Sequence, residues 1–263
     1  MRKRLVCALL WLVAAPVFAQ QPYSTEDADV AKRHSVKLSI GAEFDALQPE
    51  DTDHDRQTSV LTRASYGAVD KLEIEASAPV IYLQNAAEPN AAGYGDTQAG
   101  IKYRIREDSH GPAVALAFSV QAPTGDAERD IGSGVTMTWI NAIVEHAIAE
   151  KTKVALNAGF MPSGNPSIGA LGINAHRGKI VTFGGMLTRE VSDKLKLGGE
   201  INGAMPTTGD AQHQLHVLGG GNYELRRGTT IDAGVVVGHF TRTPRFGLMV
   251  GVTLTAPSTA AAE

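Results

Sequence analysis

Histidine is the residue type in this sequence with the most versatile chemistry, because a neutral imidazole can act as a general base or bind a metal. The eight histidines are His34, His54, His110, His146, His176, His213, His216 and His239. A hydrolase built on strands would need a serine two residues from a histidine, so that both side chains share one face. No strand-like stretch offers that pair, and His239 with Thr241 places a poor nucleophile at the edge of a loop. The sequence therefore predicts no catalytic residue.

Metal and cofactor sites are not predicted either. His213 and His216 are three residues apart, so on a strand their side chains would point to opposite faces. Cys7 is the only cysteine, which excludes an intramolecular disulfide and a cysteine-based metal cluster. The glycine run at 219–221 lacks the strand–helix context of a phosphate-binding loop. We therefore expect no metal and no cofactor.

The stretches that would position these residues alternate between apolar and polar or small residues with a period of two. In residues 245–254 every second residue is a large apolar one, and the positions between hold Arg, Gly, Met and Thr. Residues 96–105 and 113–122 alternate in the same way. This pattern gives a strand one apolar face and one polar or small-residue face.

Twelve strands of this kind are predicted, and most reach the ~9–11 residues that cross a bilayer at a tilt. They are 34–44, 57–68, 71–82, 94–106, 112–122, 134–148, 152–161, 178–190, 194–204, 212–225, 229–239 and 244–254. Short polar turns, such as 69–71 and 149–151, alternate with long loops, such as 123–133 and 162–177. The sequence thus predicts an all-β fold, a single up-and-down antiparallel transmembrane β-barrel of about twelve strands. A soluble sandwich or a lipocalin-like barrel with an inward apolar face is the structural alternative.

The domain organisation follows from composition and from the two ends of the chain. With 263 residues, 43% hydrophobic and 20% charged, and a net charge of -4, the chain fits one ordered domain and shows no basic excess for nucleic acid. Residues 1–19 read as a secretory signal peptide cleaved after Ala19. We expect a loose N-terminal lead-in over 20–33, the barrel over 34–256 and a disordered tail over 257–263.

The polar faces of the predicted strands carry charges of both signs, which a barrel would turn toward its lumen. These residues either brace a narrow interior or line the path of a solute. Their mixed signs argue against strong anion or cation selectivity. The lumen-lining candidates are Glu43, Arg63, Glu73, Glu75, Asp96, Lys102, Arg104, Lys196, Glu200 and Glu224.

One set of residues resembles a bacterial family. Gly95-Asp96-Thr97, followed by Gly100, Lys102 and Tyr103 and, after an apolar strand, by Pro123-Thr124-Gly125, is similar to the outer-membrane proteins named for the MetA pathway of phenol degradation. The resemblance covers about 34–254. It implies a transporter-like outer-membrane barrel and uptake of aromatic or other hydrophobic compounds, and it carries over no catalytic residue. From the residues alone, Asp96 either caps a turn or pairs with Lys102 or Arg104.

These observations together predict a non-enzymatic barrel in the outer membrane of a Gram-negative bacterium. Its expected function is that of a narrow channel or uptake protein for small neutral, hydrophobic or aromatic solutes. Its expected partners are outer-membrane lipid, such a solute and the barrel-assembly machinery, with no nucleic acid. Two other functions stay open: a structural or assembly barrel without transport, and an outer-membrane lipid hydrolase.

Overall fold

A computed structural model describes residues 21–48, 54–84, 89–108, 111–164, 178–207, 213–239 and 244–256. The expected signal peptide over 1–19 and the expected tail over 257–263 lie outside these ranges. No helix among the described residues is long and apolar enough to cross a membrane.

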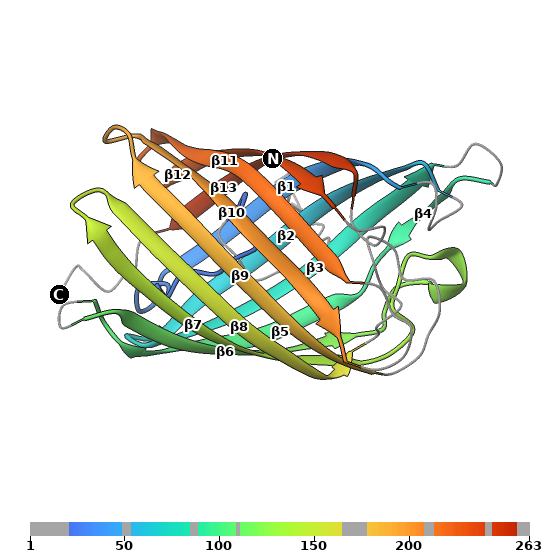
Figure 1. Cartoon of the computed structure of the whole chain (residues 1–263), viewed down its shortest axis with the longest axis horizontal. Helices are drawn as coiled ribbons and strands as arrows, with labels where there is room; N and C mark the ends of the chain where they lie inside the picture. The colour runs from blue at the N-terminus through green and yellow to red at the C-terminus, as the bar shows by residue number, and fades with distance from the viewer. Residues whose placement is uncertain are drawn as a thin grey trace, which may run out of the picture.

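The described chain is almost entirely β. The strands are β1 (Val36–Ala46), β2 (Arg56–Val69), β3 (Leu72–Gln84), β4 (Ala91–Tyr94), β5 (Thr97–Arg106), β6 (Ala113–Ala122), β7 (Met137–Ala149), β8 (Thr152–Gly164), β9 (Gly178–Glu190), β10 (Leu195–Pro206), β11 (Gln214–Arg226), β12 (Thr229–Gly238) and β13 (Phe246–Ala256). Each strand pairs antiparallel with its sequence neighbour, except that β3 pairs with both β4 and β5, and the first long strand pairs with the last. The result is a closed, tilted barrel (Figure 1). The predicted fold class is therefore confirmed.

One predicted strand is divided. The sequence predicts a single strand over 94–106, but the structure breaks it at Gly95 and Asp96 into β4 and β5, which pair in turn with β3. The break has a physical cause, because the buried Asp96 carboxylate bonds to backbone N–H groups of the loop that follows β6. β4 and β5 thus occupy one position in a barrel of twelve strand positions.

The two faces of the barrel wall are opposite in character to those of a soluble barrel. Along β13, Leu248, Val250 and Val252 point outward and are between 42% and 51% exposed. Inward positions instead hold polar groups, such as the buried Arg63 and Lys102. An apolar outer band around a polar interior suits a wall in lipid and excludes the lipocalin-like alternative, whose apolar face points inward.

The two ends of the barrel differ in their connections. Short turns join β2 to β3, β7 to β8, β9 to β10 and β11 to β12 at one end, which we call the short-turn end. The opposite, long-loop end carries the loop between β6 and β7, with its short 3-10 helix Ala127–Arg129. Because β1 begins and β13 finishes at the short-turn end, residues 21–35 enter the lumen from that side (Figure 1).

Residues 21–33, which we call the plug, lie inside the barrel. The sequence analysis expected a loose lead-in over 20–33, but Gln21, Tyr23, Thr25, Glu26 and Ala28 are all buried. The segment has no apolar periodicity, because most of its contacts are hydrogen bonds and ion pairs to inward-facing polar side chains, and only Tyr23 and Ala28 join apolar clusters. A polar segment is stable inside a protein when its backbone and charges find partners, and the lumen supplies them.

Candidate functional site: a plugged lumen and a chamber

The backbone of the plug is held by side chains of the barrel wall. Glu200 on β10 accepts hydrogen bonds from the N–H of Ser24, at 2.9 and 3.0 Å, and of Thr25, at 2.7 Å. Asn157 on β8 accepts from Glu26 N at 2.8 Å and donates to Glu26 O at 2.9 Å. These side chains replace the strand partners that an irregular buried backbone lacks.

Charges on the plug meet charges of opposite sign on the wall. Lys102 Nζ lies 3.6 Å from Asp27 Oδ1 and 3.9 Å from Glu26 Oε2. Arg104 Nη1 lies 3.4 Å from Asp29 Oδ1, and the Ala31 N–H donates to Glu73. Because burying a charge without a partner is expensive, this pairing is what allows the charged half of the lumen to be filled.

Inward-facing glycines make room for the plug. A Cβ on Gly184 would lie 2.6 Å from Thr25 Oγ1, and one on Gly198 would lie 2.7 Å from Tyr23 Oη. Cβ atoms on Gly41 and Gly251 would overlap the Gln21 side chain. Several strands therefore have glycine where the plug passes, and a larger residue there would compete with the plug for space.

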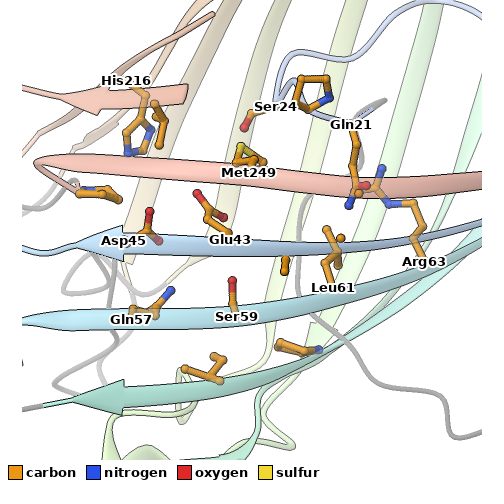
Figure 2. A pocket seen from close by; sticks show the side chains of 18 of the residues that line it. Gln21, Ser24, Glu43, Asp45, Gln57, Ser59, Leu61, Arg63, His216 and Met249 are labelled. Carbon is orange, nitrogen blue, oxygen red and sulfur yellow. The ribbon is translucent and has the colours of Figure 1, made fainter. Parts of the chain in front are cut away.

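A chamber of about 320 Å³ lies beyond the plug, toward the long-loop end. Figure 2 shows its polar wall, where side chains of β1 and β2 point into the space. The polar wall is formed by Glu43, Asp45, Gln57, Ser59 and Arg63. The apolar part of the lining is formed by Leu61, Ile81, Ile131, Leu218, Val236 and Met249.

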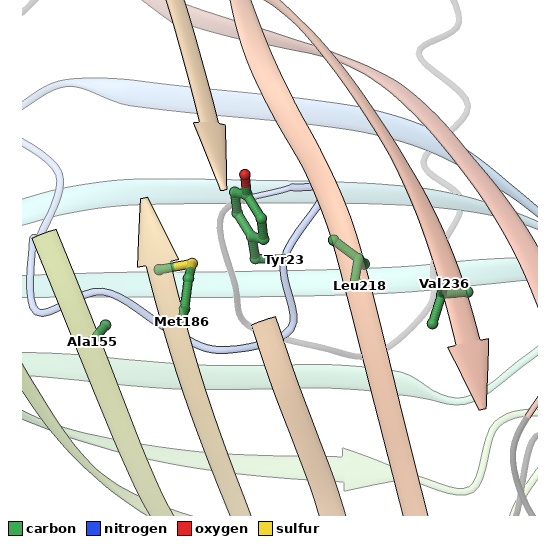
Figure 3. Close-up of a cluster of buried hydrophobic side chains, with 5 residues drawn as sticks. All are labelled: Tyr23, Ala155, Met186, Leu218 and Val236. Carbon is green, nitrogen blue, oxygen red and sulfur yellow. The ribbon is translucent and has the colours of Figure 1, made fainter. Parts of the chain in front are cut away.

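Tyr23 marks the boundary between plug and chamber. Its ring packs in an apolar cluster with Ala155, Met186, Leu218 and Val236, which point inward from four strands (Figure 3). Its hydroxyl donates to Gly220 O at 2.8 Å. Because Leu218 and Val236 also line the chamber, the plug tip gives the chamber an apolar floor.

The loop between β6 and β7 folds over the chamber, and Asp96 holds it there. The Asp96 carboxylate accepts hydrogen bonds from Gly125 N at 2.9 Å, Ser133 N at 2.7 Å and Gln121 Nε2 at 2.9 Å. Thr124 Oγ1 accepts from Thr97 N, which ties the Pro-Thr-Gly residues to the start of β5. The motif residues of the family resemblance thus meet in space, and Asp96 makes these bonds to the loop and β6 rather than an ion pair with a lysine or arginine.

Ile131 of the same loop forms part of the chamber lining. It is 1% exposed and packs with Leu47, Leu83 and Ala91. The loop is therefore anchored on both sides, by the carboxylate of Asp96 and by an apolar cluster.

The structure places the ten lumen-lining candidates on inward positions of the wall, but it divides them among different surroundings. Glu73, Lys102, Arg104 and Glu200 contact the plug. Arg63 and Glu200 line the chamber, and Glu75 and Lys196 lie at inward positions of β3 and β10. Glu43 lines the chamber and Asp96 holds the loop. Glu224 lies near the β11–β12 turn at the short-turn end. Whether these residues line the path of a solute stays a prediction.

Sequence reasoning missed Asp45, Gln57 and the plug. Asp45 continues the inward alternation of Glu43, but the predicted strand over 34–44 ended one residue too early. The signal for the plug was the set of small residues at inward positions, such as Gly184 and Gly220, which implies that something else fills the lumen.

Four of the eight histidines contact acidic, phenolic or amide groups, whereas His110 and His176 lie outside the described residues. His54 Nε2 lies 3.4 Å from Asp130 Oδ2, His146 Nδ1 lies 2.9 Å from Asp108 Oδ1, and His216 Nδ1 lies 3.2 Å from Asn202 Oδ1. His34 contacts Tyr66 Oη at 3.0 Å. Within the described ranges, no three His, Cys, Asp or Glu side chains converge as metal ligands.

A closed barrel with an apolar outer band, a polar lumen and an internal chamber defines the protein as a transmembrane β-barrel. The chain belongs to the family described as "Putative MetA-pathway of phenol degradation", whose sequence profile matches residues 25–256. The resemblance stated from the motif residues is therefore confirmed. A search of curated proteins finds no match.

Several solved structures share the fold. The COG4313 outer membrane channel from Pseudomonas putida F1 superposes with a TM-score of 0.60 at 13% identity, covering 88% of this chain and 98% of that chain. The NanC porin gives 0.57 at 9% identity, covering 82% and 98%. The KdgM porin, in complex with disordered oligogalacturonate, gives 0.53 at 13% identity, covering 84% and 98%. At these identities the similarity establishes the barrel architecture.

Proposed function

We propose that the protein is a narrow outer-membrane channel or uptake barrel for small neutral, hydrophobic or aromatic solutes. The observation that carries this proposal is the chamber of about 320 Å³, whose lining combines apolar side chains with many polar and charged ones. Small-molecule sites have this size and this mixture of surfaces. The family's description in terms of phenol degradation agrees with a solute of this class, and the printed name of the similar outer membrane channel agrees with a channel.

The charges around the plug support weak ion selectivity in that half of the lumen. Around the plug, Lys102 and Arg104 face Asp27 and Asp29, so positive and negative groups largely cancel along the axis. The plug also leaves little free space in that half of the lumen. We therefore expect the channel to pass solutes slowly and to conduct ions poorly.

A structural barrel without transport is the second candidate, and the plug is the observation that favours it, because a filled lumen resists flow. The two candidates separate in an uptake assay. Gram-negative cells that express the protein should accumulate a hydrophobic fluorescent aromatic probe, which an intact outer membrane excludes, faster than cells with an empty vector. Equal accumulation, with the barrel folded in the membrane, would support the structural candidate. Neither the channel nor the structural barrel is proposed to have a catalytic role.

The cellular context completes the proposal. Export by a signal peptide cleaved after Ala19, insertion by the barrel-assembly machinery and contact with outer-membrane lipid all fit the apolar outer band. The long loops would then face the cell exterior and the short turns the periplasm. Fractionation should recover the protein in the outer membrane, migrating faster in a gel when unheated than when boiled. Recovery as a soluble periplasmic monomer would contradict the proposal.

A further inference from the structure

The chamber carries two carboxylates on one inward face of β1. Glu43 and Asp45 are two residues apart, so both side chains point into the lumen, as Figure 2 shows. The ion pairs of the described residues all involve other carboxylates, those of Glu26, Asp27, Asp29, Glu107, Asp108, Asp130 and Glu145. Asp130, which also lines the chamber, has His54 as its partner, whereas Glu43 and Asp45 take part in none of these ion pairs.

Asp45 also has an oxygen with no hydrogen-bond partner. The residue is only 5% exposed, yet its Oδ1 makes no hydrogen bond within the described structure. Gly247 on β13 is paired with Asp45 in register, and a Cβ there would overlap Oδ1. The glycine thus makes room for the carboxylate oxygen against β13. Buried polar atoms normally have a partner in the protein, in water or in a ligand, and Asp45 lines the chamber from which such a partner would come.

Two further acceptors converge on the same chamber. Gln57 lies opposite Asp45 in the β1–β2 register, and its buried Oε1 has no partner. At the plug end, Gln21 is 8% exposed and its Oε1 also has no partner. The chamber lining also contains the guanidinium of Arg63.

From this geometry we propose that the chamber binds solutes that carry a primary ammonium head on an apolar body, with the head at Asp45, Glu43 and Gln57. An ammonium group has three donors and no acceptor, which matches a set of oxygen acceptors that lack donors. Its single positive charge offsets one carboxylate charge of the Glu43 and Asp45 pair, and the apolar body lies against Leu218, Val236 and Met249. This inference rests on the proposed function, because it concerns the same chamber, and it goes beyond the neutral solutes proposed there by adding a positively charged head group.

The test compares three ligands with one apolar body: 4-phenylbutylammonium, 4-phenylbutanol and 4-phenylbutyrate. Binding to the full-length protein in lipid nanodiscs is measured by calorimetry, with empty nanodiscs as the blank. The ammonium compound should bind wild type about tenfold more tightly than the alcohol, because charge-assisted hydrogen bonds are stronger than neutral ones. The carboxylate compound should bind most weakly of the three.

Variants assign the effect to the polar wall. Asp45→Asn should remove the preference for the ammonium compound and leave binding of the alcohol nearly unchanged. Gln57→Glu should strengthen ammonium binding, and this gain keeps the test informative should Asp45→Asn fold poorly. Glu224→Gln removes the same charge from the lumen outside the chamber, so it should leave the preference intact.

The outcomes separate this inference from the proposed function. If all three ligands bind wild type equally, or if Asp45→Asn keeps the ammonium preference, the inference is wrong while a channel for hydrophobic solutes stands. If none of the ligands binds and the fluorescent probe does not enter cells, both the inference and the proposed function are overturned.

Discussion

The two halves of the lumen differ in whether their buried polar and charged side chains have partners. In the half nearest the short turns, Lys102, Arg104 and Glu200 all find partners on the plug. In the half nearest the long loops, Asp45 is equally buried but keeps an unpaired oxygen beside open space. Satisfied polar groups stabilise a filled structure, whereas unsatisfied ones indicate a missing partner. We therefore expect the plugged half to close the lumen, and we propose solute binding only for the chamber half.

Removing the plug is the strongest test of this division. A chain that lacks residues 21–33 should show single-channel conductance several-fold above wild type, because the charged half of the lumen would fill with water and ions. Planar-bilayer recording measures the change, and a heat-modifiability gel checks that the barrel still folds. An unchanged conductance would place the barrier in the loop over the chamber instead.

A steric change should displace the plug without shortening the chain. Gly184→Val puts a side chain where Thr25 lies, since even a Cβ would be 2.6 Å from Thr25 Oγ1. Conductance should rise, though less than in the deletion. Gly185→Val is the matched control, because the atoms nearest a Cβ on the outward-facing Gly185 are at ordinary distances of 3.5 and 3.9 Å. Equal effects of the two changes would contradict displacement of the plug.

Weakening one anchor should loosen the plug by a smaller amount. Glu200→Gln replaces charge-assisted bonds to Ser24 N and Thr25 N with neutral ones, at a cost of about 1.5–3 kcal/mol in plug docking. A Ser24→Cys reporter should then react with a maleimide about tenfold faster or more. As a control, the Ser24→Cys reporter combined with Glu224→Gln should react at the rate of the reporter alone. If the reporter combined with Glu200→Gln also reacted at that rate, the plug would be held by other residues.

The smallest effect is expected at the loop over the chamber. Asp96→Asn weakens the acceptor for Ser133 N and Gly125 N, so the loop should fluctuate more at a cost of about 1–3 kcal/mol. Open-channel current noise should increase while mean conductance changes little. Maleimide labelling at Ser24→Cys should stay unchanged, because the plug does not contact Asp96; faster labelling would show that the two halves are coupled.

Much of the fold could be predicted because it follows from the alternation of apolar and polar residues along each strand. The face of each residue in β6 and β13 follows from its parity, so outward Leu116 and Val250 and inward Ser119 could be assigned without a structure. The break at Asp96 could not, because it depends on backbone groups of a loop some 30 residues away. The plug was missed for a similar reason, since Glu26 and Asp27 have no partner until β5 and β7 are in place.

The sequence by itself determined an all-β transmembrane barrel, its approximate strands, the mixed charge of its lumen and its family. Period-two alternation is a local property, and it decides which face of a strand meets lipid whatever the rest of the chain does. Only the tertiary structure decided which lumen charges are neutralised and which are not. That distinction arises when distant strands close into a barrel, because closure brings Glu200 to the plug and leaves Asp45 beside a cavity.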